Sequence, residues 1–166
     1  MRKHLKIIED NKASQGIRLA NYIIDIIALM IINIILSLIS SLLYNLTSNS
    51  FFFYFYNNTS FLWEYMMGVI VATIYYFLWE NFSNGRTLGK LITNTKVLSI
   101  DGTKPSTTQI LYRSLCRAVP FNAFSFLGYN GWHDSWTETR VINIAKYNEA
   151  VNTKIEIDNI GIKEIA

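Results

Sequence analysis

Charged side chains are scarce in this chain of 166 residues. Asp, Glu, Lys and Arg make up 16% of it, and hydrophobic residues make up 51%. Soluble domains typically carry about 25% charged residues. The net charge of +3 is too small and too dispersed to favour nucleic acid as a partner. A shortage of charge beside abundant Ile, Leu and aromatic residues indicates a membrane protein.

Cysteine and histidine are also rare. The single cysteine, Cys116, excludes an internal disulfide and a cysteine-based metal cluster. Two histidines among scattered acids do not form a zinc site of recognisable spacing. The sequence therefore predicts neither a metal nor a cofactor.

Catalytic motifs are missing too. Residues 84–90 superficially resemble a phosphate-binding loop, but the two glycines are one residue too close and Leu91 replaces the required Ser or Thr. We interpret this stretch as a tight turn with exposed cations. No Ser/His/Asp nucleophile arrangement and no carboxylate pair on one soluble face can be recognised. We therefore expect that the chain is not an enzyme.

A cleavable secretory signal is not expected. Such a signal places its apolar region directly after its basic residues. Here the basic start is followed by Glu9 and Asp10, and the apolar run begins only at Ile17. The first apolar segment is therefore predicted to remain in the protein as an anchor.

Two segments are long and apolar enough to cross a bilayer as helices. A span needs about 20 largely apolar residues. Residues 17–43 exceed this length with only two charged side chains, and residues 62–82 form a shorter second segment with Trp63 and Trp79 near its ends. Between them, residues 45–62 are rich in Asn, Ser and aromatics, which is typical of a turn at the membrane surface.

The remainder of the chain is more polar. A β-branched run over 95–100 followed by Asp101-Gly102 predicts a β-hairpin. Residues 108–127 carry two arginines four residues apart but are broken by Pro120, so we expect an amphipathic helix that is interfacial or re-entrant. The polar tail, residues 144–166, is expected to be weakly structured.

These segments define the expected fold class. It is an all-α membrane protein with a two-helix transmembrane hairpin, an amphipathic third helix and a small cytoplasmic β-hairpin. Residues 1–15 form an N-terminal segment, residues 16–143 the membrane domain and residues 144–166 the tail.

The distribution of basic residues predicts the orientation. The loop between the spans has no Lys or Arg, whereas both flanks are basic. These are Arg2, Lys3, Lys6, Lys12 and Arg18 before the hairpin and Arg86, Lys90, Lys96, Lys104, Arg113 and Arg117 after it. The positive-inside rule then places both flanks, including the N-terminus, in the cytoplasm. Because the Ile- and Asn-rich composition is typical of an AT-rich bacterial genome, we expect a multi-pass protein of the bacterial cytoplasmic (inner) membrane.

Asp25 is the most informative residue, because it lies about two turns inside the first span. Arg18 is seven residues earlier, so both side chains share one helix face. An ionised carboxylate in lipid must meet a cation, take a proton or face water. We expect Arg113 and Arg117 to be its cationic partners, because guanidinium binds carboxylate in a bidentate manner. The pair could be purely structural, or Asp25 could serve as a relay or ligand site; alternatively, both arginines could only contact lipid phosphate.

His133 and Asp134 lie in a Trp-rich turn. Such a turn could anchor the chain at the membrane surface, or a titratable His beside an Asp could shuttle protons. The expected buried polar network is therefore Arg18, Asp25, Arg113, Arg117, His133 and Asp134.

Taken together, these motifs resemble those of the RDD family of bacterial membrane proteins. The resemblance extends from about residue 16 to 142 and rests on Arg18 with Asp25, Gly85-x-Thr87-x-Gly89-Lys90, Lys96-Val97, Asp101-Gly102, Arg113-x-x-x-Arg117, Pro120, and Gly131-Trp132-His133-Asp134 with Thr139 and Val141. The family is named for an arginine and two aspartates, which correspond here to Arg18, Asp25 and Asp134. This sequence departs from the family in the short segment between Arg117 and Asp134, where many relatives carry a fuller third span.

The resemblance implies a possible role in the transport of ions or small ligands, because some members are described as cation/proton antiporters. The alternative is an accessory or assembly subunit of a larger membrane complex, with a structural polar network. Two or three helices cannot enclose an aqueous path alone. We therefore expect the lipid bilayer and either a homo-oligomer or a larger membrane-protein complex as partners.

Overall fold

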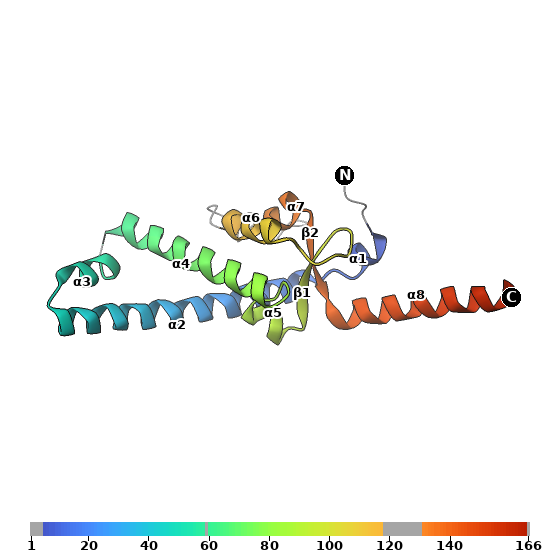
Figure 1. Ribbon diagram of the computed structural model, residues 1–166, viewed down its shortest axis with the longest axis horizontal. Coiled ribbons are helices and arrows are strands. Elements are labelled where there is room, and N and C mark those ends of the chain that lie inside the picture. Colours follow the sequence, from blue (N-terminus) through green and yellow to red (C-terminus); the bar gives the residue numbers. More distant parts are fainter. Residues whose placement is uncertain (1–4, 59, 118–130, 166) are drawn as a thin grey trace.

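The computed structural model describes residues 5–58, 60–117 and 131–165. This part of the chain is mostly helical and contains one small sheet (Figure 1). Its elements in chain order are α1 (Lys6–Asp10), α2 (Gln15–Thr47), α3 (Ser50–Tyr56), α4 (Phe61–Phe82), α5 (Leu88–Ile92), β1 (Thr95–Ser99), α6 (Thr107–Arg117), α7 (Trp132–Trp136), β2 (Thr139–Asn143) and α8 (Ile144–Ile165).

The two predicted apolar segments form the helices α2 and α4. Ser14 begins α2, because its side chain accepts a hydrogen bond from the Ile17 amide. Within the described residues, these are the two helices that are long and apolar enough to cross a membrane. Only 6% of the most apolar window of α2, and 11% of that of α4, is buried inside the protein. The apolar surface of both helices therefore faces outwards, unlike that of a soluble core helix.

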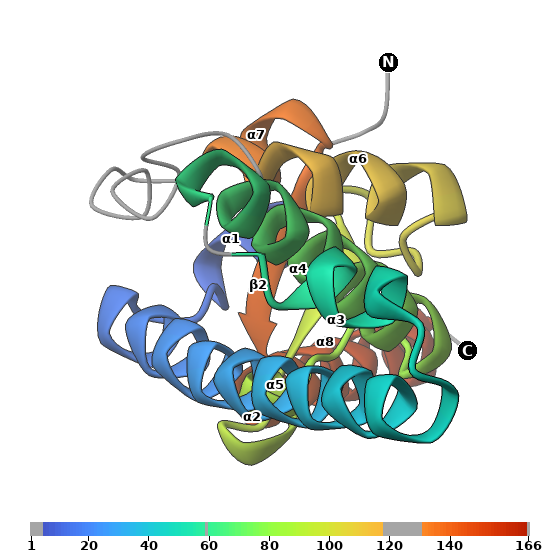
Figure 2. The same cartoon turned by 90° about the vertical axis from the view of Figure 1, so that its left-hand side faces the viewer.

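The arrangement of α2 and α4 is a narrow wedge (Figure 1). The helices converge near α5 and diverge towards α3, which lies at the opposite end beside α2. Seen along the long axis, α4 lies between α2 and α6 (Figure 2). At the narrow end, the two helices contact the rest of the fold. At the wide end, α3 lies beside α2.

The predicted local β-hairpin is wrong. The turn at Asp101-Gly102 forms, but β1 pairs in antiparallel fashion with the distant strand β2, with Val97 opposite Val141. The physical reason lies in the residues after the turn. Pro105 cannot donate to a ladder, and the Ser and Thr residues that follow it offer no apolar strand. The apolar residues that can cover β1 lie in β2.

The sheet carries a small hydrophobic core on both faces. Ile8, Leu98 and Ile142 form one buried cluster, and Ala13, Val97 and Val141 form another. The N-terminal segment joins the sheet edge, where the Ala13 amide donates to the Val141 carbonyl at 2.9 Å. This domain beside the helices is therefore built from three separate stretches of the chain.

Of the two later helices, only the last differs from expectation. The predicted amphipathic segment 108–127 is helical as α6 up to Arg117, and its remainder lies outside the described residues. The expectation of a weakly structured tail is wrong, because residues 144–165 form α8. Its first turn is capped by Asn143, whose side chain accepts from the Lys146 amide at 3.1 Å. From there α8 extends away from the other elements (Figure 1).

Candidate functional site

Asp25 lies on the face of α2 that meets α4 and α5. It is 2% exposed and accepts three hydrogen bonds, from the Tyr75 hydroxyl at 2.9 Å, the Thr87 hydroxyl at 2.7 Å and the Gly89 amide at 2.9 Å. Thr87 also begins α5, since its hydroxyl oxygen accepts from the Lys90 amide. Asp25 therefore holds α5 against both long helices.

The predicted pairing of Asp25 with Arg113 and Arg117 is wrong. Among the described residues, its hydrogen-bond partners are the neutral donors just named. Both arginines lie on α6, which packs against α4, and there they meet a different carboxylate, that of Glu80. A helix on the far side of α4 does not bring its guanidinium groups to the α2–α5 contact.

Gly89 permits this close contact. A Cβ atom at this position would lie 2.3 Å from the Asn21 carbonyl oxygen of α2. We expect Gly89→Ala to separate α5 from α2 and to weaken the amide bond to Asp25, at a cost of about 1–3 kcal/mol. Heat-induced unfolding of the purified protein in detergent measures this effect. Gly68→Ala is the matched control because its added Cβ would meet nothing within 4 Å; equal midpoints for the two variants would contradict the prediction.

Glu80, near the end of α4, is fully buried and surrounded by cations. Its carboxylate forms ion pairs with Lys90, with Arg113 Nε at 3.1 Å and with Arg117 Nη2 at 3.3 Å. Arg117 also lies over the Tyr76 ring, 4.2 Å from its centroid. A buried carboxylate requires such compensation. Glu80 is thus the point where α4, α5 and α6 meet.

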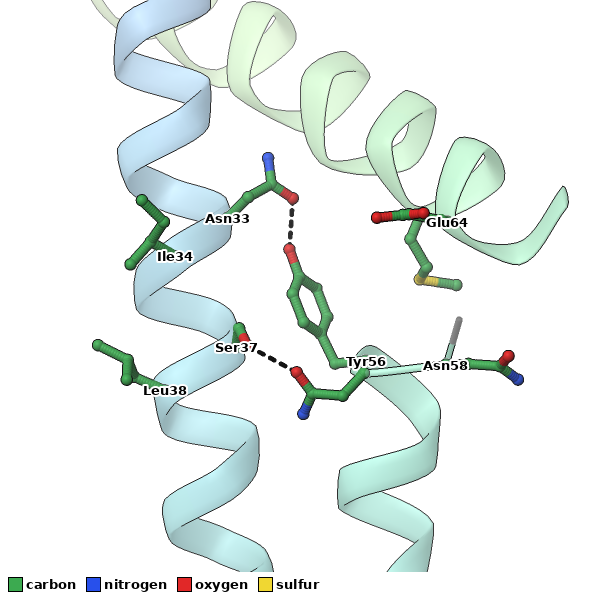
Figure 3. Close-up of a pocket in the computed structure, with 9 residues that line it drawn as sticks. Asn33, Ile34, Ser37, Leu38, Tyr56, Asn58 and Glu64 are labelled. Carbon is green, nitrogen blue, oxygen red and sulfur yellow. Dashed lines mark hydrogen bonds between the residues drawn. The ribbon is translucent and has the colours of Figure 1, made fainter. Parts of the chain in front are cut away.

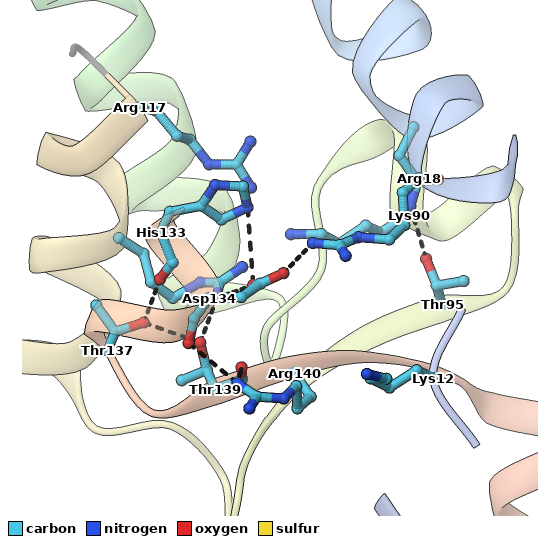
Figure 4. Close-up of polar contacts among 12 residues, drawn as sticks. Lys12, Arg18, Lys90, Thr95, Arg117, His133, Asp134, Thr137, Thr139 and Arg140 are labelled. Carbon is cyan, nitrogen blue, oxygen red and sulfur yellow. Dashed lines mark hydrogen bonds and ion pairs between the residues drawn. The ribbon is translucent and has the colours of Figure 1, made fainter. Parts of the chain in front are cut away.

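Asp134 on α7 is the second acidic centre. Its carboxylate pairs with Arg18 of α2 and with Arg113 Nη1 at 2.5 Å, and it is 1% exposed. Arg113 Nη1 also donates to the Thr139 hydroxyl of β2. Figure 4 shows Arg18 and His133 converging on Asp134 from different elements. Arg113 connects Asp134 to Glu80, so both centres form one unit.

We name this unit the ionic cluster and define it as Arg18, Glu80, Lys90, Arg113, Arg117 and Asp134. It contains four cationic and two anionic side chains. Its members come from α2, α4, α5, α6 and α7. Of the six residues expected in one network, the structure brings Arg18, Arg113, Arg117, His133 and Asp134 together and places Asp25 in a separate, neutral set of hydrogen bonds.

Burial and neighbouring charges control ionisation around α5 and α7. Burial lowers the pKa of Lys90 to about 8, against the opposing effect of Glu80. Burial also lowers the pKa of His133 well below its usual value, although Asp134 opposes this shift. At Asp134, burial would raise the pKa, but His133, Arg113 and Arg18 outweigh it and hold the pKa far below its usual range. Because the imidazole is neutral at pH 7, we attribute that lowering to the two guanidinium groups.

His133 should make stability depend on pH below about 6.5. Below this pH the His133 imidazole binds a proton in the unfolded chain but stays neutral in the folded protein. Acidification therefore favours unfolding. The loss should reach about 1 kcal/mol near pH 5.5. Comparing thermal midpoints at pH 7.5 and 5.5 for wild type and His133→Asn tests this, since the variant should lose less on acidification. An identical fall in both proteins would contradict it.

Sequence reasoning missed Glu80, Lys90 and Thr87 as parts of the site. Glu80 is absent from the buried network that the sequence predicts, and the expectation that Lys90 is exposed is wrong, because Lys90 is 2% exposed. A signal was available: Thr87 and Lys90 belong to the short glycine motif that carried part of the family resemblance.

Comparison with known proteins gives one match. A model of the RDD family matches residues 12–138. No curated protein and no solved structure matches the chain. The matched region contains every member of the ionic cluster and Asp25.

Proposed function

Because the chain belongs to the RDD family, which is made up of membrane proteins, we propose that it is a non-catalytic, multi-pass subunit of the bacterial cytoplasmic membrane. In this role it holds its small sheet domain at the cytoplasmic surface and assembles there with copies of itself or with a larger membrane protein. The polar network is structural and joins this domain to the spans.

The apolar surfaces of α2 and α4 support the membrane assignment. Large apolar side chains along both helices are exposed, for example Met30 at 61% and Leu38 at 65%. In water this surface would be unfavourable at roughly 25 cal/mol per Å² of apolar area. The lack of basic residues in the connecting loop and their abundance on both flanks support a cytoplasmic location for the ionic cluster and the N-terminus.

One observation supports a structural role above all: both carboxylates of the ionic cluster form ion pairs with several cationic side chains. Glu80 has three cationic partners, and Asp134 has two. Both are almost inaccessible to solvent. A carboxylate that relays protons or binds a transported ion must be released from its partners at some stage, and each of these is held by several elements at once. Such an arrangement is suited to fastening helices together.

Helix α8 supports an interaction role. Its start is fixed to the sheet domain, where Tyr147 packs against the Ile8 cluster. Further along, Ile155 and Ile157 are 51% and 62% exposed. The two isoleucines are two residues apart and lie on different sides of α8, so each offers a separate apolar contact to another chain.

Purification tests the proposal. The full chain, expressed in its own host and solubilised in a mild detergent, should run as a stoichiometric assembly larger than one chain. Ile155→Glu combined with Ile157→Glu should release the chain from that assembly, and the matched control is Lys154→Glu, which changes charge on the same helix. A single chain in every preparation would overturn the proposal.

Ion transport is the second candidate, and the environment of Asp25 favours it. This carboxylate lies within an apolar helix and its described hydrogen-bond partners are neutral. Cation/proton exchange by the assembled protein in vesicles should then fall to background in Asp25→Asn. Equal rates for the variant and wild type would exclude a role for Asp25 in transport.

A further inference from the structure

A second polar feature lies at the other end of the helix pair. Between α2, α3 and α4 the wedge holds a pocket of about 520 Å³ (Figure 3). This volume is in the range of small-molecule sites, roughly 300–1,000 Å³. The ionic cluster is at the opposite end of α2 and α4, so the pocket is independent of it.

Hydrogen bonds hold one wall of the pocket in place. The Tyr56 hydroxyl of α3 donates to Asn33 Oδ1 of α2 at 2.5 Å, and the Ser37 hydroxyl donates to Asn57 Oδ1 at 2.6 Å. The Asn33 amide nitrogen donates to the Leu29 carbonyl at 2.8 Å. These bonds fasten α3 to α2, and they line the pocket with fixed polar groups before any ligand enters.

Glu64 supplies the charge of the pocket. Its side chain lies on the α4 side, across from Asn33 and Tyr56 (Figure 3). Along the chain it is the only charged residue between Asp25 and Glu80, and no Lys, Arg or His occurs between Arg18 and Arg86. Among the described residues, no ion pair involves its carboxylate. The protein therefore places one uncompensated negative charge at this pocket.

The remaining lining is apolar. Ile34 and Leu38 of α2 and Met67 of α4 border the pocket beside the polar groups. A matching ligand has a positive head that reaches Glu64 and an apolar part that contacts these side chains. Anions are disfavoured, because they would meet a carboxylate with no cation to offset it. A fully apolar ligand would displace water from the Glu64 carboxylate without replacing its hydrogen bonds.

We propose that this pocket binds the ammonium group of an amphiphilic amine, with the Glu64 carboxylate as its counter-charge. The ammonium lies between Glu64 and the wall formed by Asn33 and Tyr56, and the alkyl part lies along Ile34, Leu38 and Met67. The same chemistry is present in a lipid with an amine headgroup, which can enter sideways from the bilayer, and in a free alkylamine.

Titration calorimetry of the full chain in maltoside micelles tests the binding, with empty micelles titrated in parallel. Octylammonium is the probe, and octanol and octanoate are the neutral and anionic controls. We expect saturable binding of one octylammonium per chain and none of either control. Glu64→Gln should weaken it about tenfold or more, which corresponds to about 1.4 kcal/mol, and Glu149→Gln on α8 is the matched control.

A second variant distinguishes the effect of the Glu64 charge from the effect of the cavity volume. Met67→Trp fills the pocket but keeps Glu64, so it should abolish binding. Wild-type affinity for octylammonium in both Met67→Trp and Glu64→Gln would overturn the proposal, as would equal binding of octanol. Wild-type affinity in only one of the two variants would also contradict it, because the site requires both the charge and the cavity.

Native mass spectrometry of the chain from nanodiscs distinguishes the two sources. Discs with equal amounts of phosphatidylethanolamine and phosphatidylglycerol should yield chains that retain the amine lipid, and Glu64→Gln should lose it. Octylammonium binding without lipid retention assigns the pocket to free amines. Preferential retention of phosphatidylglycerol would overturn the proposed charge selectivity.

Discussion

Glu80→Gln is expected to destabilise the protein more than any other single carboxyl-to-amide change in α2 or α4. The substitution removes the one negative charge that Lys90, Arg113 and Arg117 share, and leaves the buried Lys90 without an ion-pair partner among the described residues. Breaking a buried ion pair from one side typically costs about 3–5 kcal/mol. The midpoint of heat-induced unfolding in detergent, followed by the monodisperse fraction that remains after heating, measures the loss.

Glu64→Gln is the matched control for this experiment. It makes the same chemical change in the same helix, but at a carboxylate that is exposed and has no ion-pair partner among the described residues. Its midpoint should stay close to that of the wild type. If Glu80→Gln were no less stable than Glu64→Gln, the ionic cluster would not hold α4, α5 and α6 together.

Arg113→Met is expected to have the next largest effect. Arg113 is fully buried and is the only cluster member that contacts both Glu80 and Asp134, and it reaches Thr139 of the sheet as well. Its loss removes a partner from each acidic centre at once, again at a cost of about 3–5 kcal/mol. The same unfolding assay applies, and protease digestion should show earlier cleavage between α6 and β2.

Arg117→Met provides the comparison on the same helix. Arg117 is 14% exposed and pairs with Glu80 alone at 3.3 Å, so its replacement should cost less. The double variant Glu80→Gln with Arg113→Met should be less destabilised than the sum of the single variants, because both changes remove the same ion pair. Additive effects would show that the two side chains act independently.

The sequence was sufficient to predict the long helices, because their signal is local. Residues 17–43 and 62–82 are apolar on all sides, and α2 and α4 cover both. The partner of β1 could not be predicted in this way. Asp101-Gly102 forms a turn whichever strand follows, and only the fit of Val141 and Ile142 against Val97 and Leu98 in three dimensions selects β2.

The members of the charged site were predictable only in part, and their pairing was not predictable. A charged residue in an apolar segment is conspicuous, so Arg18 and Asp25 could be recognised from the sequence, and Asp134 was indicated by its Trp-rich turn and the family resemblance. Which cation meets which acid depends on the order of helices around α4. That order places α6 next to Glu80 and α5 next to Asp25, and no spacing along the chain encodes it.

The long separation between ion-pair partners constrains how the protein is made. Arg18 and Asp134 are 116 positions apart, so the arginine leaves the ribosome well before its carboxylate is synthesised. During that interval both apolar helices are already synthesised, while Arg18 and Arg113 still lack Asp134. Strand β2 follows directly after Asp134, so its arrival closes the sheet and the charged contacts in one late event. Nascent chains that stop before Asp134 should therefore contain both long helices but lack the sheet and the ion pairs of Asp134.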